Sequence, residues 1–329
     1  MRGPVAALVA PLVISFAIVL VTYPSTAAAS CGSESCPLDH ASRWDQSGLS
    51  FELTQQYIDQ DQPRVGTSDA AVGAISAPED EVRTVNRMTT ASGTYRPAGG
   101  AWSFSATLPF VSRTHEHIHN GAGGPEYQRW SYSGIGDLQA LAVRKFGPGA
   151  AGGARYYASA GVKAPTGARN VEEVDGDQPE PPARLGTGSW DFLAGVGSEW
   201  RLGSGPAAGS EIPLRLSLSG RVNGRGTERY RVGSELTAHA GTEVPLIPAL
   251  TALFQTNLRV HAKDDVGDTD SEASNTGGTV VYASPGLRLG LGGRTSLSAL
   301  VQFQVYQRVN GIQLVSRTNL YFSLTRAIL

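Results

Sequence analysis

Cysteine, methionine and runs of like charge are scarce in this 329-residue sequence. It holds two cysteines, Cys31 and Cys36, so no disulfide framework can hold together a chain of this length. Basic residues form neither a run nor a basic domain, and the formal net charge is −2. Nucleic acid is therefore not an expected partner.

The motifs of the common enzyme classes are also missing. The sequence has no Gly-x-Ser-x-Gly elbow, phosphate-binding loop, dinucleotide fingerprint or His-Glu-x-x-His helix. No long stretch repeats its apolar residues with the period of a helix, which argues against an α/β enzyme. We therefore expect a protein that is not an enzyme. A hydrolase whose serine, histidine and acid are dispersed along the chain is an alternative that no local pattern favours.

The N-terminus has the layout of a secretion signal. Arg2 precedes an apolar stretch at 5–21 that only Pro11 and Ser15 interrupt, and Ala27-Ala28-Ala29 offers a small-residue cleavage site. We predict a signal peptide over 1–29. An uncleaved anchoring helix and a lipid-attached Cys31 are the alternatives. No later apolar stretch is long enough for a membrane helix.

A short segment follows the predicted cleavage point. Because an exported chain meets an oxidising compartment, a disulfide between Cys31 and Cys36 is expected. Residues 30–48 show no strand pattern. They are predicted to form a periplasmic segment or plug, with a flexible leader as the alternative.

Alternation of apolar and polar residues is the dominant pattern in the rest of the chain. It is cleanest from Arg229 to Ala240, where one face holds Tyr230, Val232, Leu236, Ala238 and Ala240 and the other holds Arg229, Arg231, Glu235, Thr237 and His239. Such alternation indicates a β-strand with one apolar and one polar face. Twelve strands are predicted, at 49–58, 83–95, 102–110, 135–146, 154–163, 190–200, 214–221, 229–240, 254–262, 281–291, 297–305 and 314–324.

The connections between these strands alternate in length. Those after even strands are short, for example 97–100 and 292–294, whereas most of those after odd strands are long and polar, for example 59–82, 114–131, 165–188 and 264–277. Short periplasmic turns and longer extracellular loops are typical of outer-membrane barrels, which turn their apolar faces to lipid. Residues 49–329 are therefore predicted to form an all-β, transmembrane antiparallel barrel of about twelve strands.

Three short motifs resemble those of a known family. They are Ser133-Gly134-Ile135-Gly136-Asp137, Lys163-Ala164-Pro165-Thr166-Gly167 and Leu185-Gly186-Thr187-Gly188-Ser189-Trp190-Asp191. Their order resembles that in the outer-membrane proteins related to the meta-pathway of phenol degradation, which are FadL-like channels. The resemblance is strongest from Ser133 to Trp200, and it implies passage of small hydrophobic or aromatic compounds. The chain departs from common barrels at its end, Ala327-Ile328-Leu329, where an aromatic residue is usual.

The polar faces of the predicted strands are rich in arginine. We expect the lumen or solute path to include Arg215, Arg221, Arg229, Arg231, Glu235, His239, Arg259 and Arg288. A net basic lining favours anions such as aromatic acids. An ion-pair network that fills the lumen without selecting a solute is the alternative interpretation.

One local cluster has the chemistry of a metal site. His115, His117 and His119 share one face of an extended backbone within the loop predicted at 114–131. Three imidazoles close together could bind Zn²⁺ or Cu²⁺. A hydrated polar loop without metal is the alternative, and no other cofactor is predicted.

The sequence thus predicts an outer-membrane channel for passive uptake or efflux of small hydrophobic or aromatic compounds, aromatic acids included. Its expected partners are outer-membrane lipid, the barrel-assembly machinery and the solute. The alternative function is an outer-membrane scaffold that binds metal or another ligand at His115 to His119.

Overall fold

Strands make up nearly all of the regular structure in the computed structural model. It describes residues 47–75, 79–121, 123–147, 154–171, 179, 181–207, 211–269 and 272–328. The predicted signal peptide, the pair Cys31 and Cys36, and all but the last two residues of 30–48 lie outside these ranges and stay predictions. Within the described ranges, no helix has the length and apolar character needed to cross a bilayer.

The elements follow one another along the chain in the order of their labels. The strands are β1 (Gly48–Gln60), β2 (Gln62–Val65), β3 (Ser68–Asp69), β4 (Glu79–Arg96), β5 (Trp102–Gly121), β6 (Gly124–Ile135), β7 (Leu138–Phe146), β8 (Arg155–Ala164), β9 (Asp191–Ser204), β10 (Glu211–Asn223), β11 (Glu235–Ile247), β12 (Leu250–His261), β13 (Gly278–Gly292), β14 (Thr295–Val309), β15 (Ile312–Val315) and β16 (Thr318–Ile328). Short 3₁₀ turns lie at η3 (Pro181–Ala183), η4 (Thr227–Arg229) and η5 (Ala273–Asn275).

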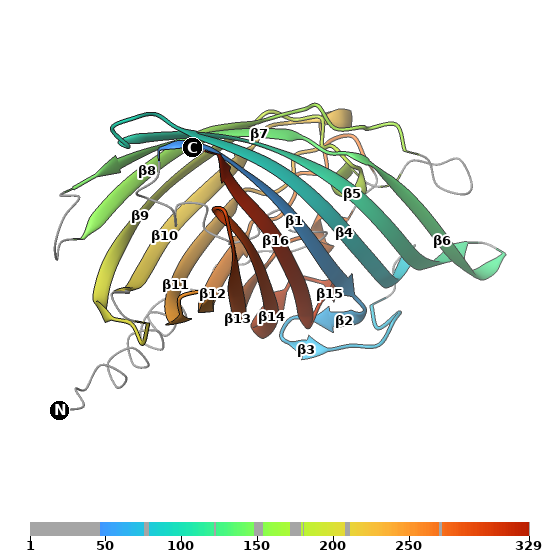
Figure 1. The fold of residues 1–329 in the computed structure, drawn as a ribbon. Coiled ribbons are helices and arrows are strands. Elements are labelled where there is room, and N and C mark those ends of the chain that lie inside the picture. Colours follow the sequence, from blue (N-terminus) through green and yellow to red (C-terminus); the bar gives the residue numbers. More distant parts are fainter. Residues whose placement is uncertain are drawn as a thin grey trace.

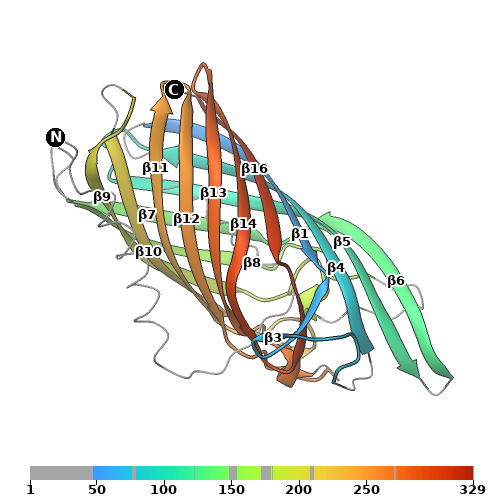
Figure 2. The same ribbon diagram turned by 90° about the horizontal axis from the view of Figure 1, so that it is seen from below.

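The long strands close into one antiparallel barrel (Figures 1 and 2). Thirteen strands form the sheet, and β6 and β7 share one position because both pair with β5, which leaves twelve positions around the barrel. The barrel closes where β1 pairs with β16, with Leu49 opposite Ile328. The predicted all-β antiparallel barrel of about twelve strands is confirmed.

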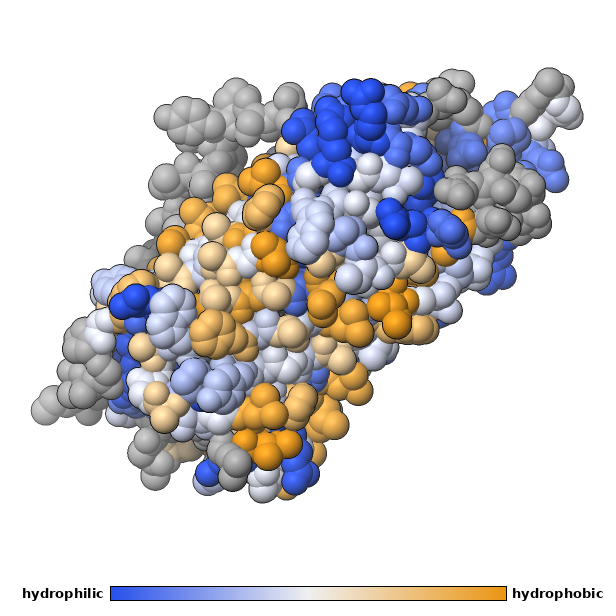
Figure 3. Space-filling model, turned by 90° about the horizontal axis from the view of Figure 1, so that it is seen from above, coloured by the Kyte–Doolittle hydropathy of each residue, from blue (hydrophilic) through white to orange (hydrophobic). Residues whose placement is uncertain are grey.

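Alternation along each strand places apolar side chains on the outside of the barrel. On β1, Phe51 and Leu53 are exposed while Ser50 and Thr54 face inward and are buried. Figure 3 shows apolar side chains covering a broad part of the outer surface, with hydrophilic residues gathered at one end. A soluble protein rarely exposes so large an apolar surface, whereas a barrel in lipid requires it.

The two ends of the barrel differ as the sequence predicts. The connections beside Gly48 and Ile328 are short, at 97–101, 147–154, 205–210, 248–249 and 293–294, whereas those at the opposite end include 61–78, 165–190, 224–234 and 262–277. We call the end with the short connections the periplasmic end and the opposite end the extracellular end. At the extracellular end β2, β3 and β15 form a small separate sheet.

The β5–β6 hairpin projects beyond the other strands at the extracellular end (Figures 1 and 2). β5 has 20 residues, about twice the 9–11 residues with which a strand crosses a membrane. Its outward face changes from Phe104, Leu108 and Phe110 to Ser112 and Thr114, which marks the edge of the apolar band. The loop predicted at 114–131 is therefore wrong. Sequence periodicity missed this part because both faces of a strand outside the membrane are polar.

Two other predicted strands have different limits. β11 begins at Glu235 rather than Arg229, because Glu228 and Arg229 adopt positive φ angles of 57° and 56° that a strand does not contain. The last predicted strand, 314–324, is divided between β15 and β16, and β15 pairs with β2 instead of the barrel.

Candidate functional site

The barrel wall is interrupted between β6 and β7. Phe110 pairs with Ile135 while Thr107 pairs with Gln139, so one extra residue is accommodated at 136–137. The interruption directs the Asp137 side chain into the barrel, where it is 2% exposed. β6 has β5 as its strand partner, and β8 pairs with β7 and β9. The wall beside β6 is completed by loop residues instead, because Ala168 N donates to Ile135 O at 3.0 Å.

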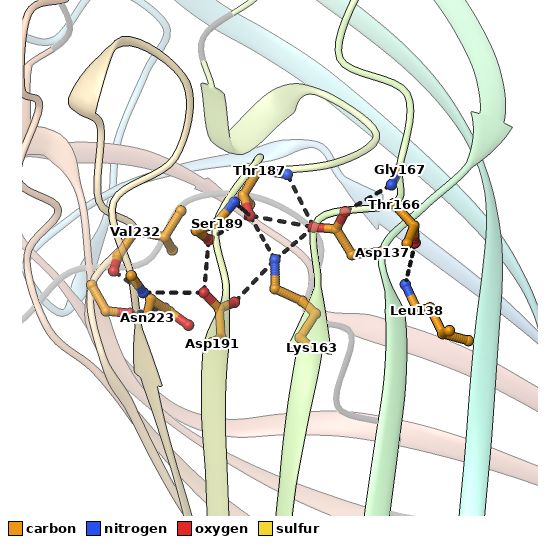
Figure 4. A network of polar contacts seen from close by, with 12 residues as sticks. Asp137, Leu138, Lys163, Thr166, Gly167, Thr187, Ser189, Asp191, Asn223 and Val232 are labelled. Carbon is orange, nitrogen blue, oxygen red and sulfur yellow. Dashed lines mark hydrogen bonds and ion pairs between the residues drawn. The ribbon is translucent and has the colours of Figure 1, made fainter.

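One buried lysine joins the three sequence motifs. Lys163 Nζ lies 2.6 Å from Asp137 Oδ2, 3.0 Å from Asp191 Oδ2 and 2.6 Å from Thr187 Oγ1 (Figure 4). The side chains of Lys163, Asp137 and Asp191 are 2–3% exposed. We call Asp137, Lys163, Thr187 and Asp191 the clamp. A buried cation needs such partners because removal of a charge from water is costly.

Backbone donors complete the clamp. Asp137 Oδ1 accepts from Gly167 N at 2.9 Å, and Asp137 Oδ2 accepts from Thr187 N at 3.1 Å. Asp191 Oδ1 accepts from Ser189 Oγ at 2.7 Å and from Gly224 N at 3.2 Å. Both carboxylates are therefore held by the connection between β8 and β9. Because one cation is shared by two carboxylates that backbone and hydroxyl donors also hold, the clamp is suited to position this connection.

The glycines of the motifs allow the close approach that the clamp requires. A Cβ at Gly186 would lie 2.7 Å from Asp137 Oδ1 and 2.8 Å from Gly167 Cα. These distances are shorter than side chains tolerate, and the second contact is to backbone that cannot swing away. The motifs predicted from the sequence are thus neighbours in space, although the sequence assigned no role to Asp137 or Thr187.

The connection held by the clamp turns into the barrel. Leu185 packs against Met88 and Val111, which point inward from β4 and β5. Arg113 donates to the carbonyl oxygens of Pro182 and Ala183. Residues 181–187 therefore cover part of the extracellular mouth from within.

A small cavity of about 90 Å³ lies beneath this inserted segment. Ile58, Met88, Val111 and Leu185 supply an apolar side. Its polar side consists of arginines and the clamp, with Arg113, Arg184, Arg221, Arg259, Lys163, Asp137 and Asp191. We call it the outer cavity.

A larger cavity of about 340 Å³ occupies the lumen on its periplasmic side, which falls within the size range of small-molecule sites. Serine and threonine are the commonest residues of its wall, at Thr54, Thr90, Ser92, Thr94, Ser103, Ser105, Thr107, Ser159, Ser217, Ser219 and Thr237. Leu141, Val143, Tyr157 and Leu193 also face it, and we call them the apolar patch. This is the inner cavity. In the sequence, alternation over the predicted strand at 135–146 was ambiguous and gave no facing for Leu141 and Val143.

A chain of ion pairs follows the inner wall near the periplasmic end. Glu199 lies 3.7 Å from Arg155 and 2.8 Å from Arg215. Glu243 lies 2.8 Å from Arg215 and 2.6 Å from Arg288. These five residues, which we call the belt, join β8, β9, β10, β11 and β13. The belt holds strands together, and none of its members lines either cavity.

The structure separates the predicted lumen residues into three groups. Arg221, Glu235 and His239 line the inner cavity, and Arg259 lines the outer one. Arg215 and Arg288 belong to the belt.

Arg229 and Arg231 lie in the connection between β10 and β11, which corrects their predicted place on a lumen face. Their side chains are 73% and 51% exposed and pair with Asp268 and Asp265 of the next connection. Tyr230, predicted to face lipid, is buried, and its hydroxyl donates to Asp264. These contacts come from a segment distant in sequence, so alternation alone could not reveal them.

The three histidines lie on β5 and are engaged by different neighbours. His115 Nδ1 lies 2.8 Å from Thr84 Oγ1, and its ring contacts Trp130. His117 Nε2 lies 3.2 Å from Gln128 Oε1, while His119 is exposed near the β5–β6 turn. No group of three metal-binding side chains is found among the residues that the structure describes.

Comparison with known proteins identifies the fold. The sequence matches no protein-family model and no curated protein. An outer-membrane channel from Pseudomonas putida F1 is similar in structure, with a TM-score of 0.62 and 12% identity over 90% of this chain and 100% of that chain. The transport unit of the autotransporter AIDA-I from Escherichia coli gives 0.54 and 9%, over 90% and 94% of the two chains.

Identities this low establish the fold alone. The predicted barrel is thus confirmed at the level of the fold: the protein is an outer-membrane-type β-barrel.

Proposed function

We propose that the protein is an outer-membrane channel through which small apolar and aromatic compounds, aromatic acids included, cross passively. The main observation in support of this proposal is the apolar patch inside the lumen. A barrel that conducts water and ions has a polar interior, and apolar side chains facing water cost about 25 cal/mol for each Å² exposed. Water gains no hydrogen bonds from the side chains of Leu141, Val143 and Leu193. The apolar part of a solute can contact these side chains in place of water.

The outer cavity repeats this combination closer to the cell surface. Met88, Val111 and Leu185 lie beside the guanidinium groups of Arg113 and Arg184. A compound with an apolar body and an acidic group finds both kinds of contact at two levels of the same lumen. The similar channel from Pseudomonas putida F1 supports the assignment to transport.

This proposal includes the location and partners of the chain. The apolar outer surface fits lipid, and we place the protein in the outer membrane after export by residues 1–29 and insertion by the barrel-assembly machinery. No enzymatic step and no nucleic acid belongs to the proposal. Density-gradient separation of bacterial membranes tests the location, which is wrong if the protein collects with the inner membrane.

Liposome swelling tests the transport function. Vesicles containing the folded protein are placed in iso-osmotic sodium benzoate or arabinose, which compares an aromatic acid with a polar sugar. We expect faster swelling in benzoate. The combined variant Leu141→Ser, Val143→Ser and Leu193→Ser should bring the two rates together.

A matched control changes the outward face of the same strand. Ala142→Ser leaves the lining of both cavities unchanged, so both rates should equal those of the wild type. Heat-dependent gel mobility confirms that each variant is folded. The proposal fails if wild-type vesicles swell no faster than empty ones in benzoate, or if the lumen variant keeps the wild-type preference.

A further inference from the structure

A glycine on the inner face of β9 lets a tyrosine lie flat against the barrel wall. Tyr157 on β8 and Gly197 on β9 pair directly in the register. A Cβ added at Gly197 would overlap the Cζ, Oη and Cε1 atoms of Tyr157. The ring of Tyr157 therefore occupies the place that a side chain at position 197 would take. We call this ring, resting on Gly197, the platform.

The platform faces the inner cavity. Tyr157 is half-buried and lines this cavity. Because one face of its ring covers Gly197, the opposite face is directed to the lumen. Among the residues that the structure describes, Tyr157 is the one phenylalanine, tyrosine or tryptophan that lines the inner cavity.

The wall beside the platform carries only small side chains. Ser159 and Gly195 form the next inward pair of β8 and β9, and both line the inner cavity. Val196, whose side chain is 56% exposed on the outside of the barrel, also lines the cavity. Its backbone is accessible from the lumen because the glycines on either side have no side chain to cover it. No bulky group of this pair blocks the approach of a ring to the platform.

One further residue of the apolar patch borders the same place. Val143 on β7 pairs with Ser159 and lies next to the small pair on the inner face. It can contact the edge of a ring that lies on the platform. Aliphatic side chains such as Val143 attract aromatic and saturated rings alike, because this contact depends mainly on the apolar area removed from water.

The platform differs from the rest of the patch because its surface is aromatic. Two aromatic rings attract each other in an offset-stacked arrangement with centroids about 4.5–7 Å apart, and the attraction exceeds what their buried area supplies. A saturated ring has no π-system and is puckered, so it gains only the area term. Discrimination between the two kinds of ring can therefore arise at Tyr157.

We infer that the platform binds planar aromatic rings by stacking and prefers them to saturated rings of the same size and charge. Gly197 is the positioning residue, since it allows the ring of Tyr157 to lie along the wall. This inference rests on the proposed transport function and names the solute class for it.

Binding to the folded protein in lipid nanodiscs measures the preference. The probes are sodium benzoate and sodium cyclohexanecarboxylate, which carry the same charge and differ in whether the ring is aromatic. Ligand-observed NMR titrations give the two dissociation constants, and empty nanodiscs correct for partition into lipid. The wild type should bind benzoate about two- to tenfold more tightly.

Substitutions at Tyr157 separate its ring from its hydroxyl group. Tyr157→Leu keeps an apolar side chain without a π-system and should bring the two dissociation constants together. Tyr157→Phe keeps the ring and should retain the preference for benzoate. Tyr156→Leu is the matched control, because the same change at the neighbouring residue affects a side chain that is 48% exposed on the outside of the barrel. It should leave the preference unchanged.

A substitution at Gly197 tests the positioning role. Gly197→Ala leaves Tyr157 in the chain but forces its ring away from the wall, so the preference for benzoate should fall toward that of Tyr157→Leu. Gly290→Ala, where a Cβ would make only ordinary contacts at 3.7 and 3.9 Å, should retain the wild-type preference. Heat-dependent gel mobility confirms that each variant is folded.

The outcomes distinguish the platform from the proposed function. The inference is overturned if the wild type binds both acids equally, if Tyr157→Leu or Gly197→Ala keeps the preference, or if Tyr157→Phe loses it. Should Gly197→Ala not fold, the two substitutions at Tyr157 decide. Vesicles that swell in benzoate while binding shows no preference refute the platform alone. Wild-type vesicles that swell no faster than empty ones refute the transport function itself.

Discussion

Lys163 Nζ lies 2.6 Å from Asp137 Oδ2, and each of the two side chains is 2% exposed. This contact joins the end of β8 to the interruption between β6 and β7, and Asp191 brings β9 to the same cation at 3.0 Å. One buried lysine thus balances part of the charge of two buried carboxylates. The arrangement explains why three motifs separated in sequence occur together in one chain.

Lys163→Met should strongly destabilise the barrel. It leaves Asp137 and Asp191 buried with no cation between them, and the loss of one partner from a buried ion pair costs about 3–5 kcal/mol. Urea unfolding in detergent, followed by heat-dependent gel mobility, measures the change. In a triple variant that adds Asp137→Asn and Asp191→Asn, part of the lost stability should return because no buried charge remains. Wild-type stability in Lys163→Met would contradict the role given to the clamp.

Gly186→Ala should loosen the inserted segment. The new Cβ would meet Asp137 Oδ1 at 2.7 Å and Gly167 Cα at 2.8 Å, and such overpacking costs about 1–3 kcal/mol. Limited proteolysis between 181 and 190 should become faster. Gly290→Ala is the control, because its nearest contacts would be ordinary ones at 3.7 and 3.9 Å. Equal proteolysis of the two variants would show that the close approach does not matter.

Two adjacent aspartates at the extracellular end should respond to pH in opposite directions. Burial raises the pKa of Asp264 above its usual 3.8, although Tyr230 and Gly233 donate to it. Its proton therefore binds more tightly in the folded state, so the stability it contributes is full below pH 3.8 and falls as pH rises through the raised pKa. Asp264→Asn, which stays neutral, should flatten the loss of thermal stability between pH 4 and 7.

The neighbouring residue supplies the comparison. Hydrogen bonding to Arg225 lowers the pKa of Asp265, so its contribution is present above pH 3.8 and is lost as pH falls through the lowered pKa. Asp265→Asn should therefore reduce stability at pH 7 and make no difference at the acidic end of the range. The assignment is wrong if thermal unfolding gives both variants the same pH profile.

Glu243→Gln should weaken the belt. Glu243 accepts from Arg215 at 2.8 Å and from Arg288 at 2.6 Å, and its neutral replacement removes the carboxylate that faces Arg288 and leaves Arg215 with Glu199. We expect a loss of about 2–3 kcal/mol in the free energy of unfolding. Glu211→Gln removes an exposed pair with Arg201 and should change it by less than about 0.5 kcal/mol. Similar losses would show that the belt is no stronger than a surface pair.

Strand alternation was reliable on strands such as β1 and β5 where lipid covers one face. Phe51 and Leu53 on β1 and Phe104 and Leu108 on β5 are exposed outward as their spacing indicates, because a wrong register would place polar groups in lipid. The pattern was unreliable outside the apolar band. His115 and His117 lie on a strand rather than in a loop. Arg229 and Arg231 lie in a connection rather than on a strand. In both places water can hydrate polar side chains in a strand or in a loop, so their spacing does not distinguish the two.

Only part of the candidate site could be predicted from the sequence. Arg221, Glu235 and His239 were placed on the polar faces of strands, and they line a cavity. The inward direction of Leu141 and Val143 could not be found from sequence, since the extra residue at 136–137 shifts the register and reverses the faces that follow.

By itself the sequence determined the fold class, the strand number and the outward apolar surface, because these depend on contacts between each residue and its solvent. Only the tertiary structure decided which charges meet. Lys163, Asp137 and Asp191 come from separate segments, and they meet because β7, β8 and β9 are neighbours in the sheet and the extra residue at 136–137 turns Asp137 inward. Local pattern carries no information about such distant partners, and the clamp depends on them.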